Sequence, residues 1–354
     1  MLFVCVSNAQ NASNVQNDST VKKLNINALP VLFYLPETGL GYGALGLATF
    51  RFKNEPLDSR PSSAQIGISL TTKNQLLIFA PYELYWKDEK WRLLGELGFY
   101  NFFYNFYGLG INSREEDFET YNVTFPRARI SLLREVATNI SIGLGYELDI
   151  YYDLKIQEGG TLDATEIAGK DEGGTVSNVG IQLFYDSRDN IFFPSKGFFV
   201  QANAFVSSSF LASSFSYTKY NLDARYYKQL KEKHILAFNG FLGVNSDGAP
   251  LYDLNSLGTR RTRGFNDRRF QDFAEFSFVS EYRFPISGRF SGAAFVSTGT
   301  LAPRLKNLFQ SNYKNAGGIG LRYLLNKKEG IRIRVDYGLS SEGGNLYFTV
   351  REAF

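Results

Sequence analysis

The feature that most limits how this chain can fold is a long run in which apolar and polar residues alternate. Residues 140–153 read ISIGLGYELDIYYD, so that one face carries Ile, Leu and Tyr and the other carries mainly Ser, Gly, Glu and Asp. A period of two residues is that of a β-strand. The same alternation recurs at 218–227 and 331–338, where Arg332, Arg334 and Asp336 share one face. A soluble sandwich core could not hold such charges unpaired, so these polar faces need water or one another.

Strand-like segments of this kind follow one another along the chain, and about sixteen are predicted. They lie at 29–35, 39–53, 62–71, 75–87, 90–103, 118–135, 139–156, 174–187, 196–208, 214–229, 233–244, 272–285, 288–298, 314–325, 329–339 and 345–353. An even count suits a bacterial outer-membrane barrel. Many segments reach the roughly 9 to 11 residues that a tilted strand needs to cross the hydrocarbon layer. The predicted fold is therefore an all-β, antiparallel transmembrane β-barrel.

The connections between these segments alternate in length. Short turns, such as 136–138 and 286–287, alternate with long connections at about 104–117, 157–173, 245–271 and 299–313. Bacterial barrels keep their periplasmic turns short and let the outward loops grow. The pattern therefore places the amino terminus on the periplasmic side, although the turns near 54–61 and 188–195 are longer than expected. A soluble all-β array could also alternate, but nothing would force its long loops onto one end.

The composition agrees with a barrel. The 354 residues include 32 Phe, 22 Tyr and 33 Gly, yet the mean hydropathy is only −0.20. No run of about 18 apolar residues occurs, which excludes a bundle of transmembrane helices. The formal charge of +3 argues against a dedicated nucleic-acid binder. Barrel strands give alternate residues to lipid and lumen, so aromatic side chains such as Tyr146, Tyr220 and Phe354 are expected to face lipid or the membrane interfaces.

Residues that carry catalytic or metal chemistry are scarce. Cys5 and His234 are the only cysteine and the only histidine, so no internal disulfide and no Cys/His metal site can form. A Ser-His or Cys-His catalytic pair is also absent, because His234 lies in a strand-like run without a nucleophile motif. His234 is therefore interpreted as structural. We expect no enzyme activity and no cofactor.

The chain is predicted to contain one domain after a short leader. Residues 1–10, MLFVCVSNAQ, are similar to the tail of a secretory signal, and the polar stretch that follows extends the leader to residue 26. Residues 27–354 then form the barrel. Length alone would suggest two domains, but a closed barrel can use the whole chain as one.

A family resemblance rests on the segment GTRRTRGFNDRRF at 258–270, which falls between the eleventh and twelfth predicted strands. The segment resembles a loop of the BamA/TamA outer-membrane assembly superfamily, whose arginine-glycine-aromatic tip folds back into the barrel and docks on acidic lumen residues. Further similarity lies in YDSRDNIFFPSKG at 185–197, GIGLRY at 318–323 and the closing FTVREAF, whose Phe354 resembles an outer-membrane sorting signal. The resemblance implies a bacterial outer-membrane location and a role in protein assembly, insertion or translocation. Its implied partners are membrane lipids, client proteins and separate assembly subunits.

The candidate site is this loop tip, Arg263-Gly264-Phe265. A guanidinium can make a bidentate pair with a carboxylate, glycine permits a sharp backbone turn beside it, and Phe265 can pack in the lumen. The alternative is that the arginines at 260, 261, 263, 268 and 269 form a solvated basic loop.

The acidic partner of Arg263 is the open question at this site. Family members usually show an F-x-D-x-G pattern, but residues 295–299 read FVSTG, with Ser297 at the acidic position. By alternation, Glu275 and Glu281 lie on one polar strand face, and Asp336 lies on another. We therefore predict that Arg263 pairs with Asp336, Glu281 or Glu275.

Two features bear on function beyond the loop. About 26 residues precede the first predicted strand, too few for a POTRA module, so the resemblance implies a stand-alone barrel. Pro30 and Pro36 flank that strand and either weaken its pairing with the last strand or merely mark its ends. The competing function is a passive pore or a structural outer-membrane protein, because about sixteen strands can enclose an aqueous channel.

Overall fold

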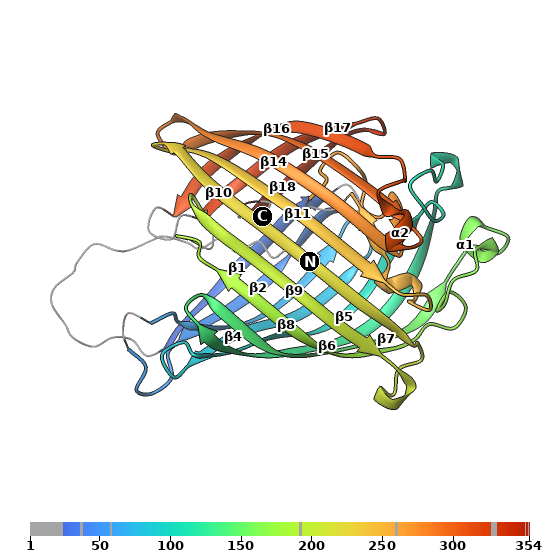
Figure 1. The fold of residues 1–354 in the computed structure, drawn as a ribbon, viewed down its shortest axis with the longest axis horizontal. Coiled ribbons are helices and arrows are strands. Elements are labelled where there is room, and N and C mark those ends of the chain that lie inside the picture. Colours follow the sequence, from blue (N-terminus) through green and yellow to red (C-terminus); the bar gives the residue numbers. More distant parts are fainter. Residues whose placement is uncertain are drawn as a thin grey trace.

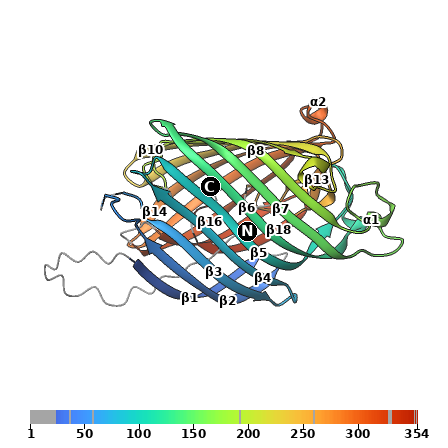
Figure 2. The same ribbon diagram turned by 90° about the horizontal axis from the view of Figure 1, so that it is seen from below.

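The computed structural model of the chain describes residues 24–35, 38–56, 59–190, 193–258, 261–326, 331–350, 352 and 354. Most of the predicted leader, with Cys5, lies outside these residues, and so do Pro36 and Arg260. The described residues form a closed antiparallel barrel of sixteen strands, shown in two views in Figures 1 and 2. The predicted all-β barrel is therefore confirmed.

The barrel strands pair in chain order, except that β11 pairs with β14 because the two strands between them form a separate small sheet. The barrel strands are β1 (Leu24–Leu35), β2 (Gly39–Phe50), β3 (Ser62–Thr71), β4 (Leu76–Trp86), β5 (Trp91–Phe106), β6 (Glu119–Ala137), β7 (Ile140–Lys155), β8 (Gly174–Asp186), β9 (Gly197–Ser207), β10 (Tyr217–Lys231), β11 (His234–Asn245), β14 (Ala274–Ser287), β15 (Phe290–Ala302), β16 (Lys314–Asn326), β17 (Ile331–Ser340) and β18 (Gly343–Val350). The small sheet consists of β12 (Asn255–Leu257) and β13 (Phe270–Asp272).

Short helical segments occur only in connections within the described part of the chain. They are α1 (Thr161–Ala164), α2 (Leu305–Leu308) and the 3₁₀ turns η1 (Glu115–Asp117), η2 (Ser209–Leu211) and η3 (Leu251–Asp253). Among the residues that the structure describes, no helix has the length and apolarity that crossing a bilayer requires. The long connections 107–118, 156–173, 246–273 and 303–313 gather at the end of the barrel that carries α1 and α2, as predicted (Figure 1). The turns 87–90, 138–139, 232–233 and 288–289 lie at the other end, although the turns 72–75 and 341–342 at the first end are also short.

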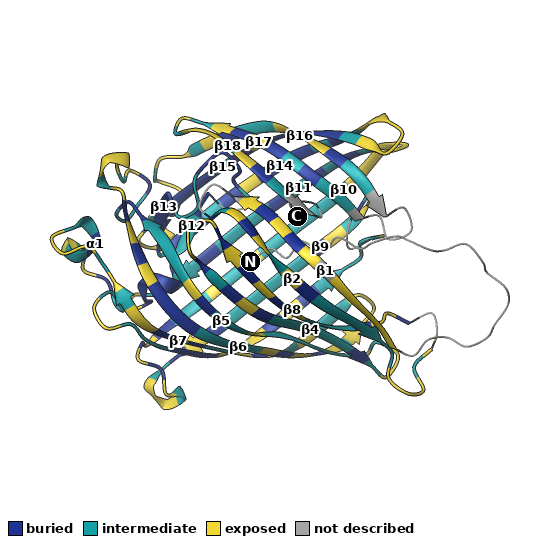
Figure 3. Cartoon of the chain, turned by 180° about the vertical axis from the view of Figure 1, so that it is seen from behind, coloured by how far each residue is buried: buried dark blue, intermediate teal, exposed yellow. Residues whose placement is uncertain are grey.

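The alternation in sequence becomes an alternation of faces. On β7, Ile142 and Leu144 are 44% and 63% exposed on the outer wall, whereas Asp149 is 2% exposed inside the barrel. Exposed and buried residues accordingly alternate along the strands in Figure 3. Tyr146 and Tyr220 lie on the exposed side as predicted. Phe354 does not, because it is buried against lumen-facing side chains, as described below.

The structure differs from the prediction at two places in the strand pattern. Strand β1 begins at Leu24, inside the segment predicted as leader, because Leu24 and Ile26 continue the outward-facing apolar series. Strands β12 and β13 are additional to the predicted set. Each has three residues, which is too short to show a period.

Candidate functional site: an inward-folded loop and its anchors

The connection between β11 and β14, residues 246–273, folds into the barrel. Its side chains Leu251, Leu257, Phe265 and Phe270 are fully buried. The short antiparallel pair of β12 and β13 holds the two arms of this loop together, with Leu257 opposite Phe270. We call residues 246–273 the interior loop.

Arg263 at the tip of the interior loop makes ion pairs with two carboxylates of the barrel wall. Its guanidinium lies 2.6 Å from a carboxylate oxygen of Glu281 on β14 and also pairs with Asp336 on β17. The side chains of all three residues are fully buried. The guanidinium carbon lies 3.6 Å from the centroid of the Phe295 ring on β15, a cation–π contact. One side chain therefore ties the loop to three strands.

Two of the three predicted carboxylates thus reach Arg263, and Glu275 does not. Glu275 lies nearer the outer end of β14, where it pairs with Arg261 at 3.4 Å and accepts a hydrogen bond from Ser277 at 3.0 Å. Ser297, at the position where the family usually has aspartate, donates to the carbonyl oxygen of Ala316 at 3.4 Å.

The Arg263 pairs belong to a larger ionic cluster, which we call the lumen cluster. Arg322 on β16 lies 2.6 Å from Asp336 and 3.4 Å from Glu281. Arg283 and Arg334 approach these same carboxylates at 2.8 and 3.3 Å. Glu352 completes the cluster through Arg322 at 3.3 Å and Arg283 at 3.8 Å. Its members are Arg263, Arg283, Arg322, Arg334, Glu281, Asp336 and Glu352. Each carboxylate therefore has two or more cationic partners.

Gly264 lets the loop backbone come close to the wall. Its φ of +125° lies in a region that other residues rarely adopt, and a Cβ would meet Ala316 and Leu339 at 3.0 Å. Its N–H donates to the Tyr347 hydroxyl at 3.0 Å, and its carbonyl oxygen accepts a hydrogen bond from Ser340 at 2.8 Å. On the facing strand, a Cβ on Gly338 would approach the Arg263 carbonyl carbon to 2.7 Å. The loop tip is thus seated against β17 and β18.

Phe265 fixes the tip on its other side. The ring makes an edge-to-face contact with Phe270, with centroids 5.7 Å apart. Ile111, Leu257, Leu301 and Ala316 complete this cluster of buried apolar residues. Burial of an aromatic side chain of this size stabilises the docked loop by roughly 2 to 3 kcal/mol relative to exposure.

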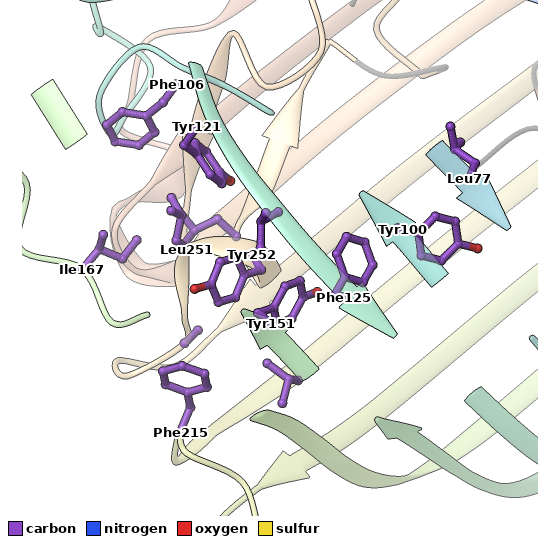
Figure 4. Packing of buried hydrophobic residues seen from close by; sticks show 14 of the residues in the cluster. Leu77, Tyr100, Phe106, Tyr121, Phe125, Tyr151, Ile167, Phe215, Leu251 and Tyr252 are labelled. Atoms are coloured by element: carbon purple, nitrogen blue, oxygen red, sulfur yellow. The ribbon is translucent and has the colours of Figure 1, made fainter. Parts of the chain in front are cut away.

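A second anchor holds the first arm of the interior loop against β7 and β10. Asp253 accepts hydrogen bonds from Tyr217 at 2.7 Å and Lys219 at 3.0 Å, both on β10. The adjacent Tyr252 stacks on Tyr151 of β7, with ring centroids 3.8 Å apart. Figure 4 shows these rings within a cluster of apolar side chains from the barrel and the loops, which includes Leu251.

The arginines after the tip are also anchored. Arg268 lies over the Tyr104 ring at 4.1 Å and donates to the Tyr121 hydroxyl at 3.0 Å. Arg269 donates to Glu342 at 2.9 Å and is 4% exposed. The alternative of a solvated basic loop is therefore wrong for these described arginines, because each has partners inside the barrel. Arg260 lies outside the described residues.

The seam between the first and last strands is the weak place in the closed sheet. Strand β1 pairs with β2 along its whole length, from Leu24 opposite Phe50 to Leu35 opposite Gly39. On its other edge, the ladder with β18 consists, among the described residues, of Tyr34 opposite Phe348. Pro30 lies four residues from Tyr34, in a part of β1 for which the described residues show no ladder pair with β18.

Phe354 lies inside the barrel instead of facing lipid. It packs with Tyr227, Ala237 and Val279, and Arg283 donates to its carbonyl oxygen at 3.3 Å. These three side chains are themselves buried, and the Phe354 ring packed against them is 6% exposed. Its proposed sorting role stays a prediction.

The remaining candidate groups show no chemistry of their own. The Nδ1 atom of His234 lies 2.5 Å from the Tyr282 hydroxyl, in keeping with a structural role. In the described ranges, no group of three or more His, Cys, Asp or Glu side chains is placed to hold a metal ion.

The sequence and the fold were compared with known proteins. A family model described as the Omp85 superfamily domain matches residues 60–349. No curated protein matches. Similar solved structures include BamA from Haemophilus ducreyi lacking POTRA domains 1–3, with 16% identity, a TM-score of 0.62, and 93% of this chain and 70% of that chain covered. CdiB from Acinetobacter baumannii has 14% identity and a TM-score of 0.60, and the match covers 93% of this chain and 60% of that chain. CdiB from Escherichia coli has 11% identity and a TM-score of 0.62, and the match covers 94% of this chain and 63% of that chain. The chain thus spans between 60% and 70% of the length of these structures, and at such identities the likeness shows the fold alone.

Proposed function

This chain belongs to the Omp85 superfamily and is a bacterial outer-membrane protein, and from that premise we propose that it inserts or translocates client polypeptides. The resemblance to the BamA/TamA superfamily inferred from the sequence is confirmed by the family match. The observation that carries the proposal is the combination of a short β1–β18 ladder with an anchored interior loop. The division into a leader and a barrel, predicted at residues 26 and 27, is also part of the proposal, with the barrel beginning at Leu24, where β1 starts.

The seam supplies an edge for an incoming strand. Between Leu24 and Phe33, β1 has a ladder partner on the β2 side only, within the described residues. Unpaired backbone groups are costly in the hydrocarbon layer and readily accept another strand. A client strand that paired there would gain main-chain hydrogen bonds worth about 1 kcal/mol each.

The interior loop favours a barrel that inserts or translocates clients over a passive pore. Its anchors reach Tyr104 on β5, Tyr121 on β6, Tyr151 on β7, Lys219 on β10 and Asp336 on β17. A loop tied to β5, β6, β7 and β10 and also to β17 crosses the lumen and obstructs it, whereas a passive pore needs an open lumen. The proposed partners are outer-membrane lipids, client proteins and separate subunits that deliver the clients.

A cross-link across the seam tests the proposal. Tyr34→Cys with Phe348→Cys, in a chain whose Cys5 is replaced by Ser, places two thiols on directly opposed residues. The matched control is Leu32→Cys with Tyr42→Cys, a pair across the continuous β1–β2 ladder with both positions exposed on the outer wall.

Oxidation is expected to stop the assembly of client proteins in the seam variant and to spare it in the control, with recovery on reduction. A census of outer-membrane proteins in cells depending on each variant measures this. Equal client levels in the oxidised seam and control variants would contradict the proposal.

A further inference from the structure

A basic groove lies at the short-turn end of β9 and β10, the end opposite α1 and α2 in Figure 1. Its volume is about 540 Å³, and its lining includes Lys196, Lys228, Lys231 and Glu232. The side chains of these four residues are exposed. The groove lies on the outer side of the barrel, on the wall opposite the β1–β18 seam in the strand order.

Two lysines lie at the end of the β9–β10 ladder. Phe198 lies opposite Tyr226, and Gly197, the first residue of β9, lies opposite Tyr227, so Lys196 and Lys228 each lie next to the last ladder pair. On its other side, Lys228 lies opposite Leu236, so β11 supplies no carboxylate there.

Two carboxylates lie near the three lysines of the groove. Glu232 pairs with Lys233 at 3.4 Å. Asp189 accepts hydrogen bonds from the backbone N–H groups of Ser195 and Lys196 at 2.9 and 3.2 Å, and from the Ser195 hydroxyl. Lys196, Lys228 and Lys231 outnumber these two carboxylates, so the groove favours an anion from outside the chain.

A row of stacked rings adjoins the lysines on the lipid-facing wall. Tyr226 stacks on Phe198, with ring centroids 4.5 Å apart, and on Phe238 at 6.3 Å. Lys196 and Lys228 each lie two residues from a ring of this row, which is about 7 Å along a strand. Aromatic rings mark the membrane–water interface, so the lysines lie at headgroup depth.

We propose that this groove binds the phosphate of an anionic phospholipid in the inner leaflet of the outer membrane. Lys196, Lys228 and Lys231 hold the headgroup, and the acyl chains lie along the rings of Phe198 and Tyr226. A zwitterionic lipid carries a cation beside its phosphate and does not offset the lysine charges. The inference is independent of the proposed client function.

Tryptophan fluorescence in bilayers tests this site. Trp86 and Trp91, the two tryptophans of the chain, flank a short turn at the same end of the barrel, where Lys87, Asp88, Glu89 and Lys90 balance in charge. Arg134 lies over the Trp91 ring at 5.4 Å, so the chain with Arg134→Ser reports on a charge-balanced turn. A variant with Tyr226→Trp, Trp86→Phe and Trp91→Phe reports on the groove. Both are placed in phosphatidylcholine bilayers that contain a minor fraction of brominated phosphatidylglycerol or, separately, brominated phosphatidylcholine.

Brominated phosphatidylglycerol is expected to quench the groove reporter more than brominated phosphatidylcholine does, and to quench the native pair equally with both lipids. Each of Lys196→Ser and Lys228→Ser should lower the excess about fivefold, since a basic residue near an anionic surface contributes roughly 1 kcal/mol. Lys228→Arg should retain the excess. These exposed substitutions leave the barrel interior unchanged, and the mobility of the folded barrel in gels verifies folding.

Three results would overturn the inference. The first is equal quenching of the groove reporter by the two brominated lipids. The second is an excess that persists in the lysine variants. The third is an excess abolished by inorganic phosphate but not by chloride at equal ionic strength, which would assign the groove to free phosphate.

Discussion

Asp336→Asn is expected to loosen the interior loop more than Arg263→Met does, although each substitution removes one charge from the same ion pair. The lumen cluster holds four arginines and three carboxylates. Loss of Arg263 equalises the charges, and Glu281 and Asp336 each keep two arginine partners. That substitution should cost about 2 kcal/mol, the strength of a charge-assisted hydrogen bond. Loss of the Asp336 charge leaves four buried guanidinium groups facing two carboxylates, which should cost about 3 to 5 kcal/mol.

Hydrogen exchange of peptides from residues 261–273 measures the opening of the loop directly. Exchange should accelerate about 30-fold in Arg263→Met, for a loss of about 2 kcal/mol, and roughly 700-fold in Asp336→Asn, for a loss of about 4 kcal/mol. Both values follow from a tenfold change in the opening equilibrium for about every 1.4 kcal/mol. Arg304→Met is the matched control, because Arg304 pairs with Asp247 at 2.8 Å with both side chains more than half exposed. The control should change exchange less than fivefold, since exposed pairs contribute about 1 kcal/mol or less. If Arg263→Met opens the loop as much as Asp336→Asn, the charge-balance argument is wrong.

Three further outcomes are expected. Gly264→Ala should destabilise the docked loop more than Gly343→Ala, because both glycines have positive φ but only Gly264 faces atoms at 3.0 Å, and thermal unfolding of the two variants measures the difference. Lys219→Met should raise single-channel conductance, because it removes the counter-ion of Asp253 and loosens the first arm of the interior loop. An unchanged conductance would contradict the idea that the interior loop obstructs the lumen. Burial raises the pKa of Asp272 in the small sheet from 3.8 to about 6, so the docked loop binds this proton more tightly than the unfolded chain does. The stability of the docked loop should therefore fall as pH rises from about 4 to 6. Hydrogen exchange of the loop across this pH range should show the fall. Asp272→Asn should reduce it but not abolish it, because burial also raises the pKa of Asp267 in the same loop.

The fold was largely predictable because the barrel imposes one simple constraint on every strand. Lipid outside and water or charge inside require alternation, and residues 140–153 display it almost without interruption. The prediction failed where this constraint is absent. Strands β12 and β13 lie inside the barrel, where neither face meets lipid, so their three-residue segments carry no alternating signal.

The site was predictable where it depends on strand faces, and was missed where it depends on distant contacts. Alternation placed Glu281 and Asp336 toward the lumen, where both reach Arg263. It also placed Glu275 there, but six residues along a strand is about 20 Å, too far to reach the same guanidinium. Arg322 could have been found, since alternation through GIGLRY puts it on the face of Gly318 and Gly320. The seating of Gly264 on Tyr347 could not, because the two residues are 83 positions apart.

The contacts of the loop tip link the lumen to the seam. Tyr347 lies on β18, one of the two seam strands, and its hydroxyl accepts from the Gly264 N–H and donates to the Phe265 carbonyl oxygen at 3.1 Å. Asp336, which holds Arg263, lies on β17, the strand that pairs with β18. The docked tip therefore steadies a strand whose ladder with β1, among the described residues, is the single pair Tyr34 opposite Phe348. Undocking the tip would remove support from β18 at the same time as it clears the lumen. In a barrel that admits clients, release of the interior loop and opening of the β1–β18 seam would then be one event, because the same few residues hold the loop tip and support β18.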